Sequence, residues 1–167
     1  MRRREVLVPQ TAELLRWAQE LFEQGLVHHK PRCRRALVRE AAMIALLAVC
    51  APRQRAMTAL RLGVHLRRDG DEWILDQEAA ITKSQRRLVL PVAERVGAIL
   101  DRYVAVERQE LLGASTCDAV WIAAGGGPLA YETVSRRIRL RAERRFRVGF
   151  GPHWFRAMQR LIGLTIA

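Results

Sequence analysis

A histidine and an arginine stand three positions apart near the end of the chain, in the segment His153-Trp154-Phe155-Arg156. Pro152 precedes them and suits the first turn of a helix, where side chains three positions apart share one face. The free backbone N–H groups of such a turn favour an anion. A phosphate held there would meet an imidazole and a guanidinium together. The alternative is an ordinary surface pair in an arginine-rich chain.

Other residues come before this segment in an informative order. Arg53 follows an apolar stretch and precedes Leu60-Arg61, Lys83 lies in a polar turn, and Gly127-Pro128-Leu129 comes before the last helices. This ordered set resembles the catalytic domain of the tyrosine recombinase, or phage integrase, family. The resemblance extends from Arg34 to Arg156, which is most of the chain.

The resemblance implies that Arg53, Lys83, His153 and Arg156 are catalytic, while Arg61 packs or pairs structurally. Attack on a phosphodiester builds charge on its oxygens, and two always-charged guanidinium forks can bind that charge. Lys83 would protonate the departing 5′ oxygen, and His153 would share in proton transfer near neutral pH. In the family a tyrosine nucleophile conserves the bond energy in a covalent intermediate, so no cofactor is implied.

The sequence departs from the family pattern at several places. Tyr103 and Tyr131 both precede the histidine, whereas the family's nucleophile follows it. Because the sequence stops at Ala167, we expect a truncated or frameshifted product that binds DNA without cleaving it. Ala56 stands where the family often has an acidic residue, and residues 1–31 are too few for the usual separate DNA-clamping domain.

The charge of the chain favours a polyanionic partner. Lys+Arg number 29 against 17 Asp+Glu, a net charge of +12, and we expect the partner to be double-stranded DNA. Arg86 and Arg87, which lie beside Lys83, are expected to contact DNA, as are Arg137 and Arg141 in the arginine run over 136–147. The alternative for that run is a solvated helix face, although like charges at this density repel one another.

Several classes of protein are disfavoured by composition. Three scattered cysteines without a CxxC pair argue against a disulfide framework and a zinc ribbon, so no metal is expected. The apolar run over 41–51 is too short to span a bilayer, and the stretch Val6-Leu7-Val8 is too short for a secretory signal. We therefore expect a cytoplasmic protein without a membrane partner.

Apolar spacing predicts an α+β fold that is mainly helical and carries a small three-stranded antiparallel sheet. Helices are predicted over 11–26, 41–50, 55–62, 92–112 and 131–147 and from Pro152, with strands over 64–66, 73–75 and 87–90. The helix over 41–50 is apolar on every side, which is typical of a central core helix. We assign residues 1–31 to an N-terminal helix and basic linker, and residues 32–167 to a partial catalytic domain.

The leading functional hypothesis is DNA integration or site-specific DNA recombination by a recombinase-type domain of a mobile element. On its own such a domain would bind DNA and hold the scissile phosphate without cleaving it. The alternative is a non-catalytic DNA-binding relic or accessory protein. An RNA binder is disfavoured because the chain lacks aromatic RNP strands and a GxxG loop. For an intact protein, the resemblance leaves open a homo-oligomer on DNA.

Overall fold

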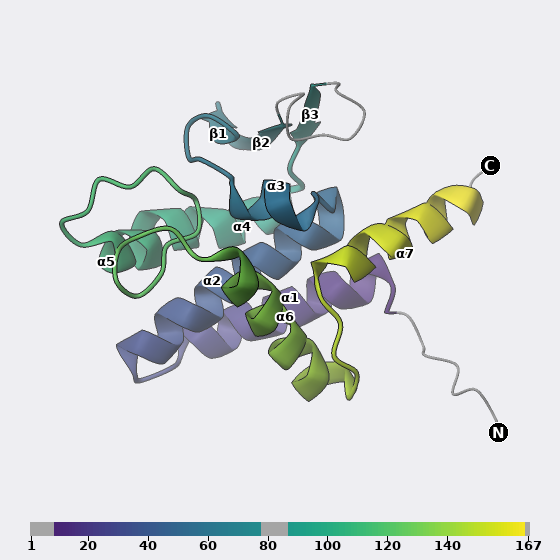
Figure 1. The fold of residues 1–167 in the computed structure, drawn as a ribbon, viewed down its shortest axis with the longest axis horizontal. Helices are drawn as coiled ribbons and strands as arrows, with labels where there is room; N and C mark the ends of the chain where they lie inside the picture. Colours follow the sequence, from purple (N-terminus) through teal and green to yellow (C-terminus); the bar gives the residue numbers. More distant parts are fainter. Residues whose placement is uncertain (1–8, 78–86, 166–167) are drawn as a thin grey trace.

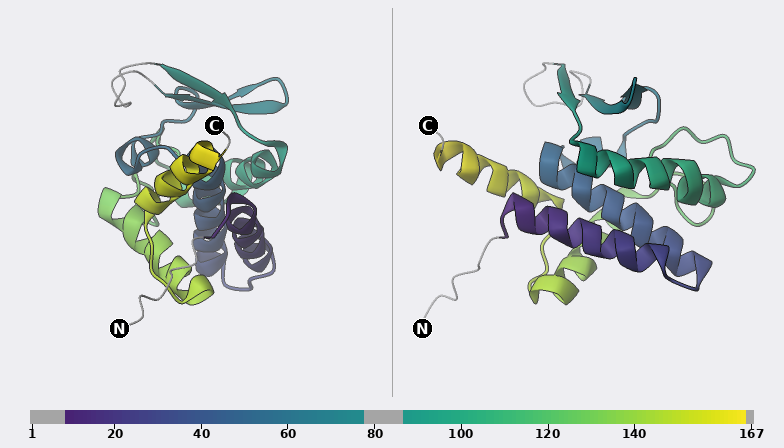
Figure 2. Two further views of the ribbon diagram at one scale, coloured as in Figure 1. Left: turned by 90° about the vertical axis from the view of Figure 1, so that its right-hand side faces the viewer. Right: turned by 180° about the vertical axis from the view of Figure 1, so that it is seen from behind.

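The computed structural model describes residues 9–77 and 87–165. Its body begins with two helices, α1 (Thr11–Leu26) and α2 (Pro31–Cys50), which pack side by side (Figures 1 and 2). Gly25 allows their close approach, because a Cβ at this position would lie 2.9 Å from Val38 Cγ2. Pro31 is the first residue of α2. A backbone N–H at this position has no partner within the helix, so its absence from proline costs no hydrogen bond.

The second helix forms the centre of the core. Every residue over 37–48 is buried, and α2 contacts α1, α4, α6 and α7. This confirms that the helix predicted over 41–50 is central, although its last two residues are only half-buried. Two charged side chains, Arg39 and Glu40, are buried together with the apolar ones.

A small antiparallel sheet lies over one side of the helical body (Figure 1). Its strands, in spatial order, are β1 (Leu66–Asp69), β2 (Glu72–Gln77) and β3 (Leu88–Pro91). The three-stranded sheet predicted from the sequence is thus confirmed. The first strand begins later than the predicted range 64–66, because Gly63, with φ 82°, donates to Leu66 O at 2.8 Å and forms a tight turn.

The stretch predicted as one helix over 92–112 is interrupted. It consists of α4 (Glu94–Arg102), a π-helical turn η2 (Tyr103–Glu107) and α5 (Arg108–Leu112). Glu107 is fully buried, and Arg102, five positions earlier, donates from Nη2 to its Oε1 at 2.8 Å. This five-residue spacing matches the π turn. The ion pair accompanies the turn, and apolar periodicity does not reveal it.

Three further helices complete the body: α3 (Gln54–Thr58), α6 (Tyr131–Phe146) and α7 (Pro152–Thr165). The predictions over 131–147 and from Pro152 are confirmed. Helix α3 is shorter than the predicted range 55–62, because Leu60 O and Leu62 N are bonded to the loop that precedes α6. Within the described residues, no helix is long and apolar enough to cross a membrane.

Candidate nucleic-acid interface

Arg53 lies at the junction of α2 and α3. Helix α2 ends at Ala51, whose backbone is left-handed with φ 38°, and Pro52 prevents the helix from continuing. Arg53 then caps α3, and its carbonyl oxygen accepts a hydrogen bond from Met57 N at 2.7 Å. The Arg53 side chain is half-buried and pairs with no carboxylate among residues 9–77 and 87–165. Its guanidinium is therefore available to an anion.

His153 and Arg156 lie in the first turn and a half of α7. The helix begins at Pro152, as the sequence predicts. Phe155 and Met158 are buried and hold this end of α7 on the core. His153 is exposed and Arg156 is half-buried at the surface, so both side chains can reach a bound molecule.

The loop before α7 passes closely over α6 at Gly151. A Cβ on this glycine would lie 3.3 Å from Ser135 Oγ and 3.5 Å from His153 Nδ1. The imidazole and the α6 hydroxyl therefore both approach the same point of the backbone. A Cβ at Gly151 would press only slightly on the Ser135 hydroxyl and would be in ordinary contact with the histidine ring.

Two hydrogen bonds connect the elements that carry these residues. Gln54 Nε2 donates to Tyr131 O at 3.2 Å and links α3 to the start of α6. Gln159 Nε2 donates to Ala48 O at 3.4 Å and links α7 to the end of α2. Helices α3, α6 and α7 meet at this corner of the molecule (Figures 1 and 2).

Arg53 is close enough to Arg156 for its positive charge to act on the Arg156 guanidinium. The pKa of Arg156 is lowered, first by burial and then by the positive charges of Arg53 and Arg160. A guanidinium remains protonated at neutral pH in spite of such a shift. The corner therefore holds several positive charges, and we find no carboxylate paired with these three arginines in the described parts of the chain.

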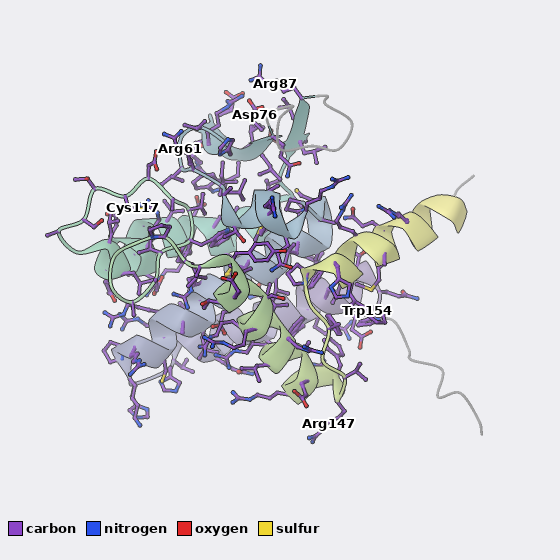
Figure 3. All side chains as sticks on the ribbon, viewed as in Figure 1. Arg61, Asp76, Arg87, Cys117, Arg147 and Trp154 are labelled. Atoms are coloured by element: carbon purple, nitrogen blue, oxygen red, sulfur yellow. The ribbon has the colours of Figure 1, made fainter. Side chains whose placement is uncertain are left out.

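The polar turn that was expected to carry Lys83 and Arg86 lies outside the described residues. Arg87, which comes just before β3, donates from Nε to Asp76 Oδ1 at 2.9 Å. This bond holds the pKa of Asp76 below its usual value, and the Arg87 side chain is still 67% exposed. Figure 3 shows this pair on the sheet, away from Trp154 at the start of α7. A DNA contact by Arg87 stays a prediction.

Two arginines of the α6 run contact the same buried carboxylate. Arg137 Nε donates to Glu40 Oε1 at 2.6 Å, and Arg141 Nε donates to the other oxygen of the same carboxylate. These two residues, expected to contact DNA, thus hold α6 on α2, while a contact of their partly exposed ends with DNA stays a prediction. Sequence reasoning missed Glu40, although an acid at the edge of an apolar helix was the available signal.

The predicted structural role of Arg61 agrees with its contacts. Its Nε donates to Asp118 Oδ2 at 2.7 Å and holds the loop before α6 against the end of α3. Both side chains are about half exposed, so the pair positions backbone rather than forming part of the core.

The two tyrosines of the chain differ in burial and in the partners of their hydroxyl groups. Tyr103 is fully buried, its hydroxyl donates to Val120 O at 2.9 Å, and burial raises its pKa to about 12. Tyr131 is 43% exposed at the first position of α6. The described residues contain no group of three or more metal-ligating side chains.

The helical body and the small three-stranded antiparallel sheet match a fold like that of a tyrosine recombinase catalytic domain. Among solved structures, the chain is similar to the XerH site-specific recombinase bound to palindromic difH substrate in a post-cleavage complex. That similarity has a TM-score of 0.64 at 12% identity and covers 89% of this chain and 39% of XerH.

The XerH pre-cleavage complex with difH substrate is similar to the same extent. Its TM-score is 0.62 at 12% identity, over 90% of this chain and 40% of XerH. The chain therefore spans about two fifths of the length of the recombinase that it resembles in fold. No family model and no curated protein sequence matches it.

Proposed function

We propose that this chain is a recombinase-type domain of DNA integration or site-specific recombination that binds double-stranded DNA and holds its scissile phosphate. The proposal depends chiefly on the proximity of Arg53 and Arg156, which come from distant parts of the sequence. Two cationic groups without a paired carboxylate in the described residues favour a bound anion. The similar XerH structures are complexes with difH substrate, which supports DNA as the source of that anion.

Each residue has a separate task, as it would be performed in a recombinase that does cleave DNA. Arg53 and Arg156 bind the phosphate oxygens that gain charge, and preorganised donors of this kind stabilise a transition state by about 3 kcal/mol each. His153, whose ring lies close to the backbone at Gly151, shares in proton transfer. The role of Lys83, protonation of the departing 5′ oxygen, rests on the family resemblance alone.

We further propose that these residues bind DNA without cleaving it. The Tyr103 hydroxyl is engaged with the backbone inside the core, and Tyr131 does not match the position of the family's nucleophile. Incubation with a nicked suicide substrate, which traps covalent recombinase–DNA adducts, should give no adduct on a denaturing gel. A covalent band that depends on either tyrosine would contradict this part of the proposal.

The binding function can be tested by fluorescence anisotropy with a labelled duplex over a series of salt concentrations. Arg53→Ala and Arg156→Ala should each weaken binding about tenfold or more, because each removes charge-assisted hydrogen bonds to phosphate. The matched control is Arg55→Ala, since Arg55 is exposed on the same short helix as Arg53. It should change the affinity only slightly.

The same experiment separates the two functional hypotheses. If Arg53→Ala and Arg156→Ala weaken binding no more than Arg55→Ala, a specific phosphate site is absent. Only a generic, salt-sensitive affinity would then remain, as expected for a non-catalytic DNA-binding relic or accessory protein.

A further inference from the structure

The positive corner of the molecule includes an arginine that the family resemblance does not explain. Arg160 follows Arg156 by four positions in α7, and residues at this spacing lie on the same face of a helix. Arg160 is exposed. It pairs with no carboxylate in the described segments.

The packing of α7 determines which way this face points. Phe155 and Met158 are buried against the core. Gln159, next to Arg160, reaches Ala48 O at the end of α2. Arg156 and Arg160 therefore lie along the side of α7 that borders the junction of α2 with α3, where Arg53 caps α3. The positive charges of Arg53 and Arg160 both act on Arg156, in agreement with this placement.

The spacing of the charges indicates what they could bind. Four residues of helix advance about 6 Å, so the side chains of Arg156 and Arg160 start far enough apart to reach different phosphates. Successive phosphates of one DNA strand rise about 3.4 Å along the helix axis and also wind around it, so their separation in space is greater than this rise. Three guanidiniums that repel one another are thus better matched to a run of phosphates than to one.

We propose that Arg160 binds a phosphate next to the one held by Arg53 and Arg156, so that α7 follows the DNA backbone beyond the scissile position. This inference rests on the proposed DNA-binding function and extends it to a residue outside the motif. Arg160 would then contribute to affinity and to the register of the bound strand.

The test compares Arg160→Ala, Arg160→Gln and Arg160→Lys in the duplex-binding assay. Removal of the charge should weaken binding about tenfold and lower the slope of log affinity against log salt by about one. Arg160→Lys should recover most of the slope, because it retains the charge. The control is Arg16→Ala, since Arg16 is an exposed arginine of α1 that borders α4. Helices α1 and α4 lie at the front in the right-hand view of Figure 2. It should leave the slope unchanged.

A double variant identifies which phosphate Arg160 contacts. If the two arginines bind different phosphates, the losses from Arg156→Ala and Arg160→Ala should multiply in the double variant. If the double variant binds the duplex as tightly as the single variant with the lower affinity, the two arginines share one phosphate, and the inference is overturned. So would Arg160→Ala variants that bind as well as the wild type.

These failures are distinct from failure of the proposed function. If Arg156→Ala weakens binding and Arg160→Ala does not, the phosphate site stands and its extension along α7 is wrong. If Arg53→Ala and Arg156→Ala both bind like Arg55→Ala, the phosphate site itself is wrong. Thermal melts of the Arg160 variants should match that of the wild type, because the Arg160 side chain is exposed.

Discussion

Replacing Glu40 by alanine should destabilise the protein more than any surface charge change. Glu40 has no exposed area and accepts hydrogen bonds from Arg137 and Arg141, one on each carboxylate oxygen. Removing one partner of a buried ion pair costs about 3–5 kcal/mol. The two arginines are 34% and 18% exposed and can be partly rehydrated, so we expect the lower end, about 3 kcal/mol. For a chain of this size that corresponds to a fall in Tm of about 9 °C.

The assay is chemical denaturation followed by tryptophan fluorescence, with a thermal melt by circular dichroism. The matched control is Glu20→Ala, which removes a similar α6 contact at the surface. Its pair with Arg145 is 39% and 37% exposed and should contribute at most about 1 kcal/mol. If Glu40→Ala lowers the free energy of unfolding by no more than Glu20→Ala, the buried carboxylate does not hold α6 on α2 as described.

Three other predictions concern single sites. Gly126→Ala should cost about 1–3 kcal/mol in a melt, because Gly126 has φ 87° and its Cβ would lie 3.0 Å from a carbonyl oxygen. Gly125→Ala, with no atom within 4 Å of its Cβ, should change stability by less than about 0.5 kcal/mol, and equal effects would contradict the loop geometry. Burial raises the pKa of Cys50 to about 12, so iodoacetamide at neutral pH should leave Cys50 unmodified in native protein, as read by mass spectrometry, and label it only after unfolding. Its modification in folded protein would show that the thiol is accessible. The Arg87 hydrogen bond lowers the pKa of Asp76, so the stability that Asp76 contributes is present above its unfolded pKa of about 3.9 and is lost as the pH falls further. Urea titrations should therefore show Asp76→Asn less stable than the wild type at pH 7, with the difference shrinking below about pH 4; a constant difference would exclude this linkage.

The structure gives the ion pairs of α6 a role in positioning the candidate site. Glu40 fixes α6 on α2, and α6 in turn supports α3 through the Gln54 bond to Tyr131 and the α7 loop beside Ser135. A change at Glu40 is therefore expected to act on the proposed phosphate site through α6 and the elements that it contacts. We expect Glu40→Ala to weaken duplex binding even under conditions where the protein remains folded.

Short-range signals in the sequence were sufficient to predict most of the local elements, although not all of their bounds. The central position of α2, the helix over 131–147 and the start of α7 at Pro152 all follow from neighbours within a few positions. The hairpin around Gly70 could be predicted for the same reason. In each case the signal and the structure that it predicts lie in one short segment, and burial of one helix or strand face is what connects them.

The sequence by itself also determined which residues to consider for the site, since the order of Arg53, Lys83, His153 and Arg156 is the basis of the family resemblance. It could not distinguish one arginine from another. Only the tertiary structure decided that Arg137 and Arg141 hold a buried carboxylate, whereas Arg53 and Arg156 lie together without one in the described residues. The physical reason is that side chains distant in sequence meet only through the packing of whole helices, and the charge that each one faces is set by that packing.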